Sequence, residues 1–286
     1  MTKPFELLLW QKRQATIIYH FTTLAFLKEI QKRFNALVTE TETVLGEALD
    51  SGRDHYLEDP RWGHRNTADN WANSGPWSAM KDTQKGFAIS VAQRAFEVYF
   101  GTGFNYLERM FSEYSTLWMS HEQETKFNKA FKALCEFAAP MDKIIRNRQI
   151  DYWYYSYWWQ TYGYLFPRVP KFKVHTDIEC ESGQVPPRTG VYVAQNDPNA
   201  GLQFGWTGSY QGYYDPLPDS QTFNELGLHA IEYIGRDNMW FNEAKMAEFC
   251  MLPQYRGILT YDDPPKPGNG ATIARAADIS RPCQWY

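Results

Sequence analysis

Apolar side chains recur every three or four residues through most of the first 166 positions, which is the spacing that places them on one face of an α-helix. The clearest stripe contains Phe127, Phe131, Leu134, Ala138, Met141 and Ile145. Similar stripes predict helices over Phe87–Leu117, with a bend expected at Gly101 and Gly103, and over Lys12–Leu49, and a shorter helix is expected around residues 67–79. Four antiparallel helices would bury these stripes against one another, so we predict a helical bundle over residues 1–166.

Aromatic side chains crowd the end of this helical part, where residues 150–166 read IDYWYYSYWWQTYGYLF. In a helix they would point in every direction, so the segment needs cover on all sides. We interpret it as the last helix of the bundle, wedged between the bundle and the rest of the chain. An aromatic platform for a sugar or a protein partner, centred on Tyr152–Trp159, is the alternative, whereas a membrane-interface belt would need a basic face.

The pattern of the chain changes after Phe166. Twelve of the sixteen prolines lie between Pro167 and Tyr286, and apolar residues now alternate with polar ones over short runs, which is the period of β-strands. Strands are expected at Lys171–Ile178, Val191–Val193 and Leu202–Trp206. A domain boundary is therefore expected just after Phe166.

Turns and helices follow these expected strands. Gly208–Pro218 has the composition of a loop, and Thr222 with Glu225 has the spacing of a box that caps the start of a helix. The sequence thus predicts an α+β protein. In it, the helical bundle of residues 1–166 is followed by a smaller part, residues 167–286, with a short-stranded sheet and packed helices.

The charge balance argues against nucleic acid as a partner. Lys and Arg total 29 against 33 for Asp and Glu, which gives a net charge of −4, whereas nucleic-acid binding draws on a basic excess. The whole acidic surplus lies in residues 167–286, which hold 10 basic and 14 acidic side chains. Aromatic residues make up 17% of the chain, which excludes a disordered chain and indicates extensive aromatic packing or an adhesive surface.

No segment of the sequence has the pattern of a membrane span or an export signal. The apolar run at Phe5–Trp10 is short and is followed by Lys12 and Arg13, whereas an export signal has its positive charge before a longer apolar run. No run approaches the roughly eighteen apolar residues that a membrane span requires. We therefore expect a soluble cytoplasmic protein with no membrane partner. Reduced thiols are also expected, because no C-x-x-C pair occurs among Cys135, Cys180, Cys250 and Cys283.

Candidate catalytic and metal-binding patterns are weak. His55 and His64 lie among acidic residues, but their spacing matches no ligand pattern. Glu225 and His229 stand four residues apart on one expected helix, where a plain contact between neighbours is the simpler interpretation than acid-base chemistry. We expect no metal, no cofactor and no catalytic residue.

Two segments resemble a known family. Residues 189–208 read TGVYVAQNDPNAGLQFGWTG, and residues 222–240 read TFNELGLHAIEYIGRDNMW. They contain the series T-G-x-Y, D-x-N-A, F-x-W-T-G, T-F-N-x-x-G and G-R-x-x-x-W. With these motifs, about residues 186–250 resemble the C-terminal region of bacterial polymorphic-toxin immunity proteins of the immunity protein 71 and 72 families. The helical first part is compatible with the resemblance but carries no motif of it.

The resemblance implies a cytoplasmic protein that binds and blocks a toxin delivered by a neighbouring cell, for example through type VI secretion. It implies no catalytic residue. Taken as residues alone, the glycines and aromatics of the motifs suit turns and core packing. The loops between the motifs are therefore the expected toxin-contacting surface.

The candidate partner-binding residues follow from charge and aromaticity. A toxin with a basic groove would meet acidic side chains on exposed loops, and tyrosines among them would supply the anchors that dominate binding energy. Our candidates are Asp177, Glu179, Glu181, Asp197, Tyr210, Tyr213, Tyr214, Asp215 and Asp219. Two alternatives stay open, namely a hydrolase with an undetected carboxylate site and an aromatic-rich carbohydrate-binding or scaffold module.

Overall fold

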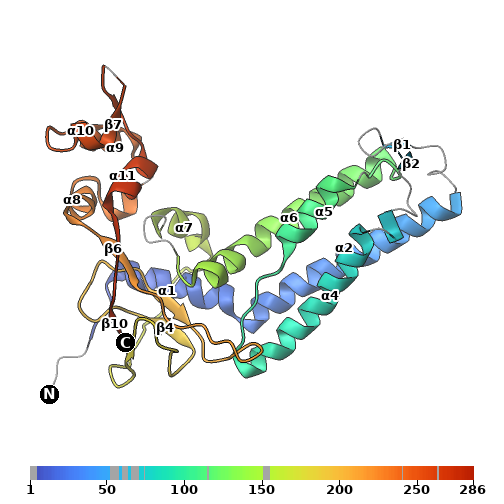
Figure 1. The fold of residues 1–286 in the computed structure, drawn as a ribbon, viewed down its shortest axis with the longest axis horizontal. Helices are drawn as coiled ribbons and strands as arrows, with labels where there is room; N and C mark the ends of the chain where they lie inside the picture. Colours follow the sequence, from blue (N-terminus) through green and yellow to red (C-terminus); the bar gives the residue numbers. More distant parts are fainter. Residues whose placement is uncertain are drawn as a thin grey trace. The chain divides into compact units, whose positions relative to one another are not determined.

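The computed structural model describes residues 5–51, 58–59, 64–65, 71–73, 75–114, 116–150, 155–239, 241–262 and 264–286 (Figure 1). It confirms the α+β class, with a helical N-terminal region and short antiparallel strands. The chain divides into two compact units, residues 1–21 with 143–286, and residues 22–142. We call them the α+β unit and the helical unit. This division differs from the expected boundary after Phe166, because the first helix and the chain from Lys143 onward belong to the α+β unit.

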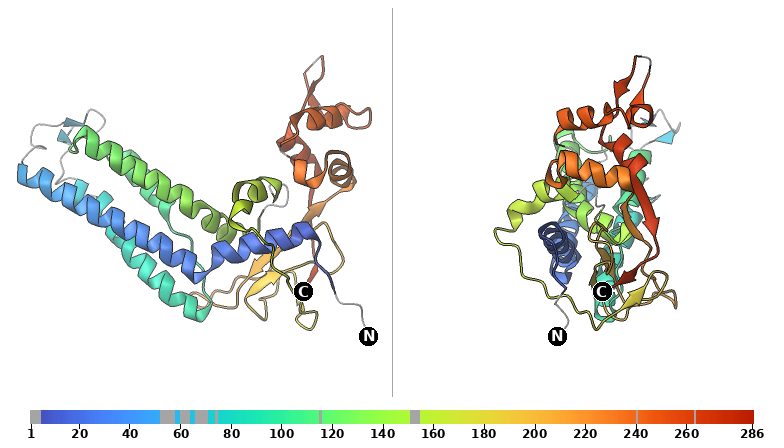
Figure 2. Two further views of the ribbon diagram at one scale, coloured as in Figure 1. Left: turned by 180° about the vertical axis from the view of Figure 1, so that it is seen from behind. Right: turned by 90° about the vertical axis from the view of Figure 1, so that its left-hand side faces the viewer.

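The helical unit is built from α2 (Leu24–Ser51), α4 (Pro76–Gln93), the short helix η1 (Arg94–Phe96), α5 (Phe104–Glu113) and the first part of α6 (His121–Asn147) (Figures 1 and 2). Helix α2 packs against α4, and α4 packs against α5. The apolar spacing predicted the buried face of α6 correctly, since Phe127, Phe131, Leu134, Ala138 and Met141 are buried, whereas in the run Phe87–Leu117, Phe87 is buried but Tyr106 and Leu117 are exposed. Helix α6 continues through Pro140.

The break between α4 and α5 is held by a side chain of α6. After η1 the chain turns through Gly103, whose φ of 75° is the left-handed conformation that glycine adopts at little cost. Asp142 accepts hydrogen bonds from the Thr102 amide at 2.7 Å and from the Thr102 hydroxyl at 2.5 Å. The continuous amphipathic run expected in this region is therefore two helices.

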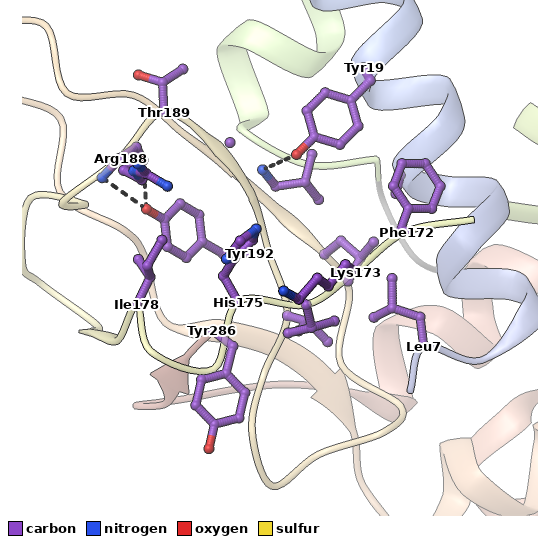
Figure 3. A pocket seen from close by; sticks show the side chains of 16 residues that line it. Leu7, Tyr19, Phe172, Lys173, His175, Ile178, Arg188, Thr189, Tyr192 and Tyr286 are labelled. Carbon is purple, nitrogen blue, oxygen red and sulfur yellow. Dashed lines mark hydrogen bonds between the residues drawn. The ribbon is translucent and has the colours of Figure 1, made fainter. Parts of the chain in front are cut away.

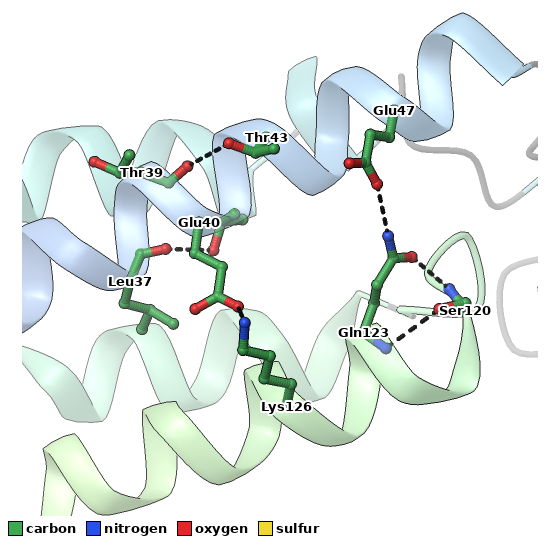
Figure 4. Close-up of polar contacts among 9 residues, drawn as sticks. Leu37, Thr39, Glu40, Thr43, Glu47, Ser120, Gln123 and Lys126 are labelled. Carbon is green, nitrogen blue, oxygen red and sulfur yellow. Dashed lines mark hydrogen bonds and ion pairs between the residues drawn. The ribbon is translucent and has the colours of Figure 1, made fainter.

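Polar side chains also join α2 to α6 (Figure 4). Glu40 Oε1 lies 2.5 Å from Lys126 Nζ, and Gln123 Nε2 donates to Glu47 Oε2 at 2.9 Å. These groups are largely exposed, so solvent screening and side-chain entropy leave such contacts with little effect on stability. Burial of nearby apolar side chains such as Leu37 and Phe127 is the larger contribution.

Part of the helical unit lies outside the described residues. The backbone of β1 (Glu58–Asp59) pairs with that of β2 (His64–Arg65). The short helix expected around residues 67–79 is described only in part, and α4 begins at Pro76. His55 also lies outside the described residues, and so does the His64 side chain.

The first expected helix, Lys12–Leu49, is two helices in the structure. Helix α1 (Leu9–Thr22) ends just before Thr23, and α2 begins just after it. The Thr23 hydroxyl accepts a hydrogen bond from the Phe26 amide at 3.2 Å, which caps the start of α2. The boundary between the two units falls at this break.

Two-stranded antiparallel ladders take the place of the expected sheet among the described residues of the α+β unit. The pairs are β3 (Cys180–Glu181) with β10 (Gln284–Trp285), β4 (Gly190–Tyr192) with β5 (Gln203–Gly205), β6 (Ser220–Phe223) with β9 (Asp278–Arg281), and β7 (Thr260–Tyr261) with β8 (Lys266–Pro267). The helices are α1, α7 (Tyr155–Tyr162), η2 (Gly163–Leu165), α8 (Glu225–Ile234), η3 (Arg236–Asn238), α9 (Glu243–Cys250), α10 (Arg256–Leu259) and α11 (Gly270–Ala277).

Two buried clusters hold this unit together. Helices α8, α9 and α11 pack around Phe249, and a second cluster surrounds Trp285 on β10. Both side chains are fully buried. Among the described residues, no helix combines the length and the apolar character that crossing a membrane requires.

Two local predictions in the α+β unit are wrong. Lys171–Ile178 forms no strand, although it lies close to β4 in a shared cavity wall. Thr222 belongs to β6, and its hydroxyl donates to Asp197 at 2.6 Å, so this hydroxyl does not cap α8. Asn224 caps α8 instead, because its side chain accepts a hydrogen bond from the Gly227 amide at 3.1 Å.

Candidate functional site

The motifs of residues 189–240 are joined to one another by hydrogen bonds. Asp197 Oδ2 accepts from the Thr222 hydroxyl at 2.6 Å, and Asp197 Oδ1 accepts from the Asn199 amide at 2.9 Å. Asn199 Oδ1 in turn accepts from Arg236 Nη2 at 2.8 Å. Three separate motifs thereby form one network within the α+β unit.

Arg236 is the cation of this network. Its guanidinium lies over the rings of Trp10 and Phe223, with centroids 4.1 and 5.6 Å away. Burial lowers the pKa of Arg236 to about 10, so the group still carries its charge at neutral pH. The cation–π contacts and the Asn199 hydrogen bond offset the loss of water around that charge.

The remaining motif residues also pack internally. The Thr207 amide donates to Thr189 Oγ1 at 3.0 Å, which ties the ends of β4 and β5. A Cβ added at Gly227 would come within 3 Å of Phe223 and Ala277, so only glycine allows this approach of α8 to its neighbours. These contacts support the interpretation that the motifs build the fold.

Exposed tyrosines stand on a tight turn between the motifs. Tyr210 and Tyr213 exchange two backbone hydrogen bonds of 3.0 and 2.9 Å, and the intervening Gln211 and Gly212 have φ angles of 52° and 82°. Positive φ at both central residues indicates a type I′ turn. We call residues 210–214 the tyrosine hairpin.

The hairpin presents an unusual amount of aromatic surface. Tyr210, Tyr213 and Tyr214 are 46%, 79% and 56% exposed. Its backbone is nonetheless fixed by the turn, so little conformational entropy would be lost when a partner covers it. Large, pre-organised aromatic side chains of this kind are typical binding anchors.

The base of the loop that carries the hairpin is immobilised. Leu217 is fully buried in the Trp285 cluster, and its amide donates to the Gln184 carbonyl at 2.9 Å. Arg148, just after α6, donates from Nη1 to the Pro216 carbonyl at 2.5 Å and from Nε to the Phe204 carbonyl at 3.1 Å. The loop therefore has an anchored base and an exposed aromatic tip.

Arg148 is a positioning residue that the sequence did not reveal. It has a positive φ of 59° and is 9% exposed, and its guanidinium lies 4.3 Å from the centroid of the Trp206 ring. Burial lowers the pKa of Arg148, and the nearby charge of Asp215 partly opposes this shift. No local pattern marked this arginine, because its partners lie 56 and 68 positions away.

Replacing Arg148 by methionine should lower the free energy of unfolding by about 2 to 4 kcal/mol, because the buried Phe204 carbonyl and the partly buried Pro216 contact lose a charged donor. Urea unfolding followed by circular dichroism measures this loss, and hydrogen exchange should quicken in residues 208–219. Arg146→Met removes the same charge from an exposed position of α6 and is the matched control. Equal stability of the two variants would contradict this role.

The acidic candidates do not form one group with the hairpin. Asp215 is exposed directly after Tyr214, and Asp219 is half-buried farther along the loop. Asp197 is occupied by the motif network, as both of its oxygens accept hydrogen bonds.

The other three acidic candidates lie around β3. Asp177 and Glu179 are exposed before this strand, with Asp177 Oδ1 3.5 Å from His175 Nδ1. Glu181 on β3 accepts from Gln284 Nε2 at 2.7 Å. Of all the acidic candidates, only Asp215 is an immediate neighbour of the tyrosines.

The structure also places the weaker chemical candidates. His229 Nδ1 lies 2.9 Å from the Tyr255 hydroxyl, and the imidazole packs on Phe249, so its ring belongs to the α8–α9 core. In the part of the chain that the structure describes, no group of three His, Cys, Asp or Glu side chains could hold a metal ion.

The four cysteines lie in environments that keep thiols protonated. Burial raises the pKa of Cys135 to about 12 and that of Cys283 to about 11, and it also raises the pKa values of Cys180 and Cys250. The thiolate is the reactive form, so these thiols are poor nucleophiles at neutral pH.

At pH 7.5 we expect iodoacetamide to label the native protein slowly, and all four thiols to react in denaturant. Above pH 9 stability should fall, because the unfolded state, with an ordinary thiol pKa, loses its protons first. Mass spectrometry after timed quenching measures the labelling. Rapid labelling of the native protein, or an intact disulfide, would contradict the expectation.

The described residues together offer a fixed aromatic tip beside an exposed carboxylate. Comparisons of the chain with protein-family models, with curated proteins and with solved structures find no match.

Proposed function

We propose that this protein is a cytoplasmic immunity protein that binds a cognate secreted bacterial toxin and neutralises it by stoichiometric occlusion. The observation that carries the proposal is the tyrosine hairpin, residues 210–214, whose three exposed rings stand on an anchored loop. Covering such a surface with a partner removes apolar area from water, which makes the free energy of binding more favourable.

Charge supports the same kind of partner. Residues 167–286 carry the acidic surplus of the chain, and Asp215 borders the hairpin. A toxin that acts on nucleic acid through a basic groove would be steered toward this surface. The tyrosines would then enter the groove and exclude the substrate.

The resemblance of residues 186–250 to the immunity protein 71 and 72 families supports the proposal independently of the hairpin. The motif residues engage one another in the structure, so they would maintain the scaffold. The loop between the motifs would then be free to match one particular toxin.

Co-expression tests the proposal. The product of the gene adjacent to this chain's gene, or its C-terminal domain, is expressed in a susceptible host, with and without this protein, and growth is recorded. We expect growth to be rescued and the two proteins to copurify in a fixed ratio. Failure to rescue growth and to bind would refute the proposed function.

Stoichiometry separates occlusion from the hydrolase alternative. Titration of purified toxin should reach full inhibition at a fixed molar ratio, because each inhibitor molecule covers one active site. An enzyme that destroys the toxin or its product would protect at far lower ratios and with a dependence on time. That outcome would replace the present proposal.

A further inference from the structure

A second feature of the α+β unit lies apart from the tyrosine hairpin. A cavity of about 190 Å³ is formed by the start of the chain with α1, the unpaired segment 172–178, and β4 with its flanks (Figure 3). Tyr19 and Phe172 make one aromatic wall, with stacked rings 5.9 Å apart and 16° between their planes. In Figure 3 these two rings lie opposite Arg188.

The walls of this cavity combine apolar side chains with polar groups, and hydrogen bonds hold two of its tyrosines in place. The Tyr19 hydroxyl accepts from the Val191 amide at 3.2 Å. The Tyr192 hydroxyl donates to the Arg188 carbonyl at 2.5 Å and accepts from the Arg188 amide at 3.2 Å. Both tyrosine hydroxyls thus brace the walls, while the rings face the cavity together with aliphatic residues.

Two cationic side chains and one imidazole line this cavity. Lys173, His175 and Arg188 line it, and none of its sixteen lining residues is acidic. Asp177 Oδ1 lies 3.5 Å from His175 Nδ1. Lys173 and Arg188 are exposed and line the cavity, so two solvent-accessible cations border it.

Size and charge together define the ligand. The volume is below the roughly 300 to 1,000 Å³ of sites for drug-sized molecules and cofactors, so the cavity holds about one ring. We propose that it binds a small one-ring aromatic carboxylate or phosphate, with the ring against Tyr19 and Phe172 and the anionic group at Lys173 and Arg188. The site is independent of the proposed toxin-binding function.

Each part of the ligand contributes a separable share of affinity. The ring is taken out of water against aromatic and aliphatic side chains, which favours binding without direction. The anionic group forms charge-assisted hydrogen bonds with the lysine and the arginine, which fix its orientation. A molecule with only one of these parts should bind at least tenfold more weakly.

Isothermal titration calorimetry with three probes tests this division. Phenyl phosphate carries both parts, benzyl alcohol carries only the ring, and inorganic phosphate carries only the anion. We expect saturable binding of phenyl phosphate at one site, with both other probes at least tenfold weaker. Absence of saturable phenyl phosphate binding, or equal binding of either partial probe, would overturn the proposal.

A matched pair of double variants locates the site. Lys173→Gln with Arg188→Gln should weaken phenyl phosphate binding about tenfold or more, because both cations at the mouth are lost. Arg168→Gln with Lys171→Gln removes the same net charge from exposed positions that do not line the cavity. Equal weakening in the two double variants would show non-specific charge attraction and overturn the assignment.

A third variant tests the aromatic wall. Phe172→Leu keeps an apolar side chain but removes the ring that stacks on Tyr19, so phenyl phosphate should lose affinity while inorganic phosphate does not. Melting temperatures of all variants confirm folding. Unchanged phenyl phosphate affinity in this variant would contradict the placement of the ring.

Discussion

Replacing Trp158 by alanine should lower the free energy of unfolding by about 3 to 5 kcal/mol, the range for a large buried aromatic side chain. Trp158 lies on α7 and is 6% exposed, packed against Phe21 and Tyr162 at centroid distances of 6.4 and 5.5 Å. A cavity at this point would remove contacts from α1 as well as from α7. Urea unfolding followed by circular dichroism measures the change.

Trp159→Ala is the natural comparison on the same helix. Trp159 is half-buried, stacked on Phe166 at 6.2 Å with the Arg13 guanidinium 4.9 Å from its ring centroid. The Trp159→Ala substitution should therefore lower the free energy of unfolding by only about 1 to 2 kcal/mol. If both variants melted like the unaltered protein and lost a binding partner, the aromatic-platform hypothesis for this segment would be preferred.

Replacing Tyr213 and Tyr214 together by alanine should weaken toxin binding by about a hundredfold or more. Exposed aromatic anchors of an interface commonly contribute 2 kcal/mol or more each, and about 1.4 kcal/mol corresponds to a factor of ten. The loss should appear mainly as faster dissociation. Surface plasmon resonance with the immobilised toxin domain measures both rate constants, and growth rescue should fail in parallel.

Tyr164→Ala is the matched control for this experiment. Tyr164 is 79% exposed, as is Tyr213, but it lies on η2 and not on the hairpin. Its replacement should leave toxin binding unchanged. If protection and both rate constants survived the hairpin substitutions, the interface would have to lie elsewhere, and the helical unit would be the next surface to test.

Charge reversal at Asp215 and Asp219 tests the electrostatic contribution to toxin association. Lysine at both positions should slow association and weaken its dependence on salt, since long-range steering acts before the two surfaces touch. Asp215 should account for most of the effect, because it is exposed whereas Asp219 is half-buried. An association rate unaffected by the double reversal would indicate a toxin surface without a basic groove.

Local sequence reasoning succeeded where one physical factor dominates. The stripe from Phe127 to Met141 has a helical period, and burial of that stripe follows from the hydrophobic effect alone. It failed where two local options have similar free energies. Thr222 and Asn224 are both good helix caps, and the choice depends on Asp197, which lies 25 positions from Thr222 and takes its hydroxyl.

Long-range contacts also decided the extended segments. Phe172 and Val174 alternate with polar residues, as a strand would, but a ladder forms only where a neighbouring backbone offers its amides and carbonyls. Within residues 171–178 no ladder forms, and Phe172, Val174 and Ile178 line a cavity instead. The break at Thr23 was invisible for a related reason, since the residues on both sides favour a helix.

The sequence by itself determined the α+β class, the helical N-terminal region and the loop in which three tyrosines stand close together, because periodicity and turn chemistry are local properties. Only the tertiary structure decided that these tyrosines are exposed on a closed turn and that Arg148 anchors their loop. It also brought Lys173 and Arg188 to one cavity. These features depend on contacts between residues far apart in the chain, which no local pattern encodes.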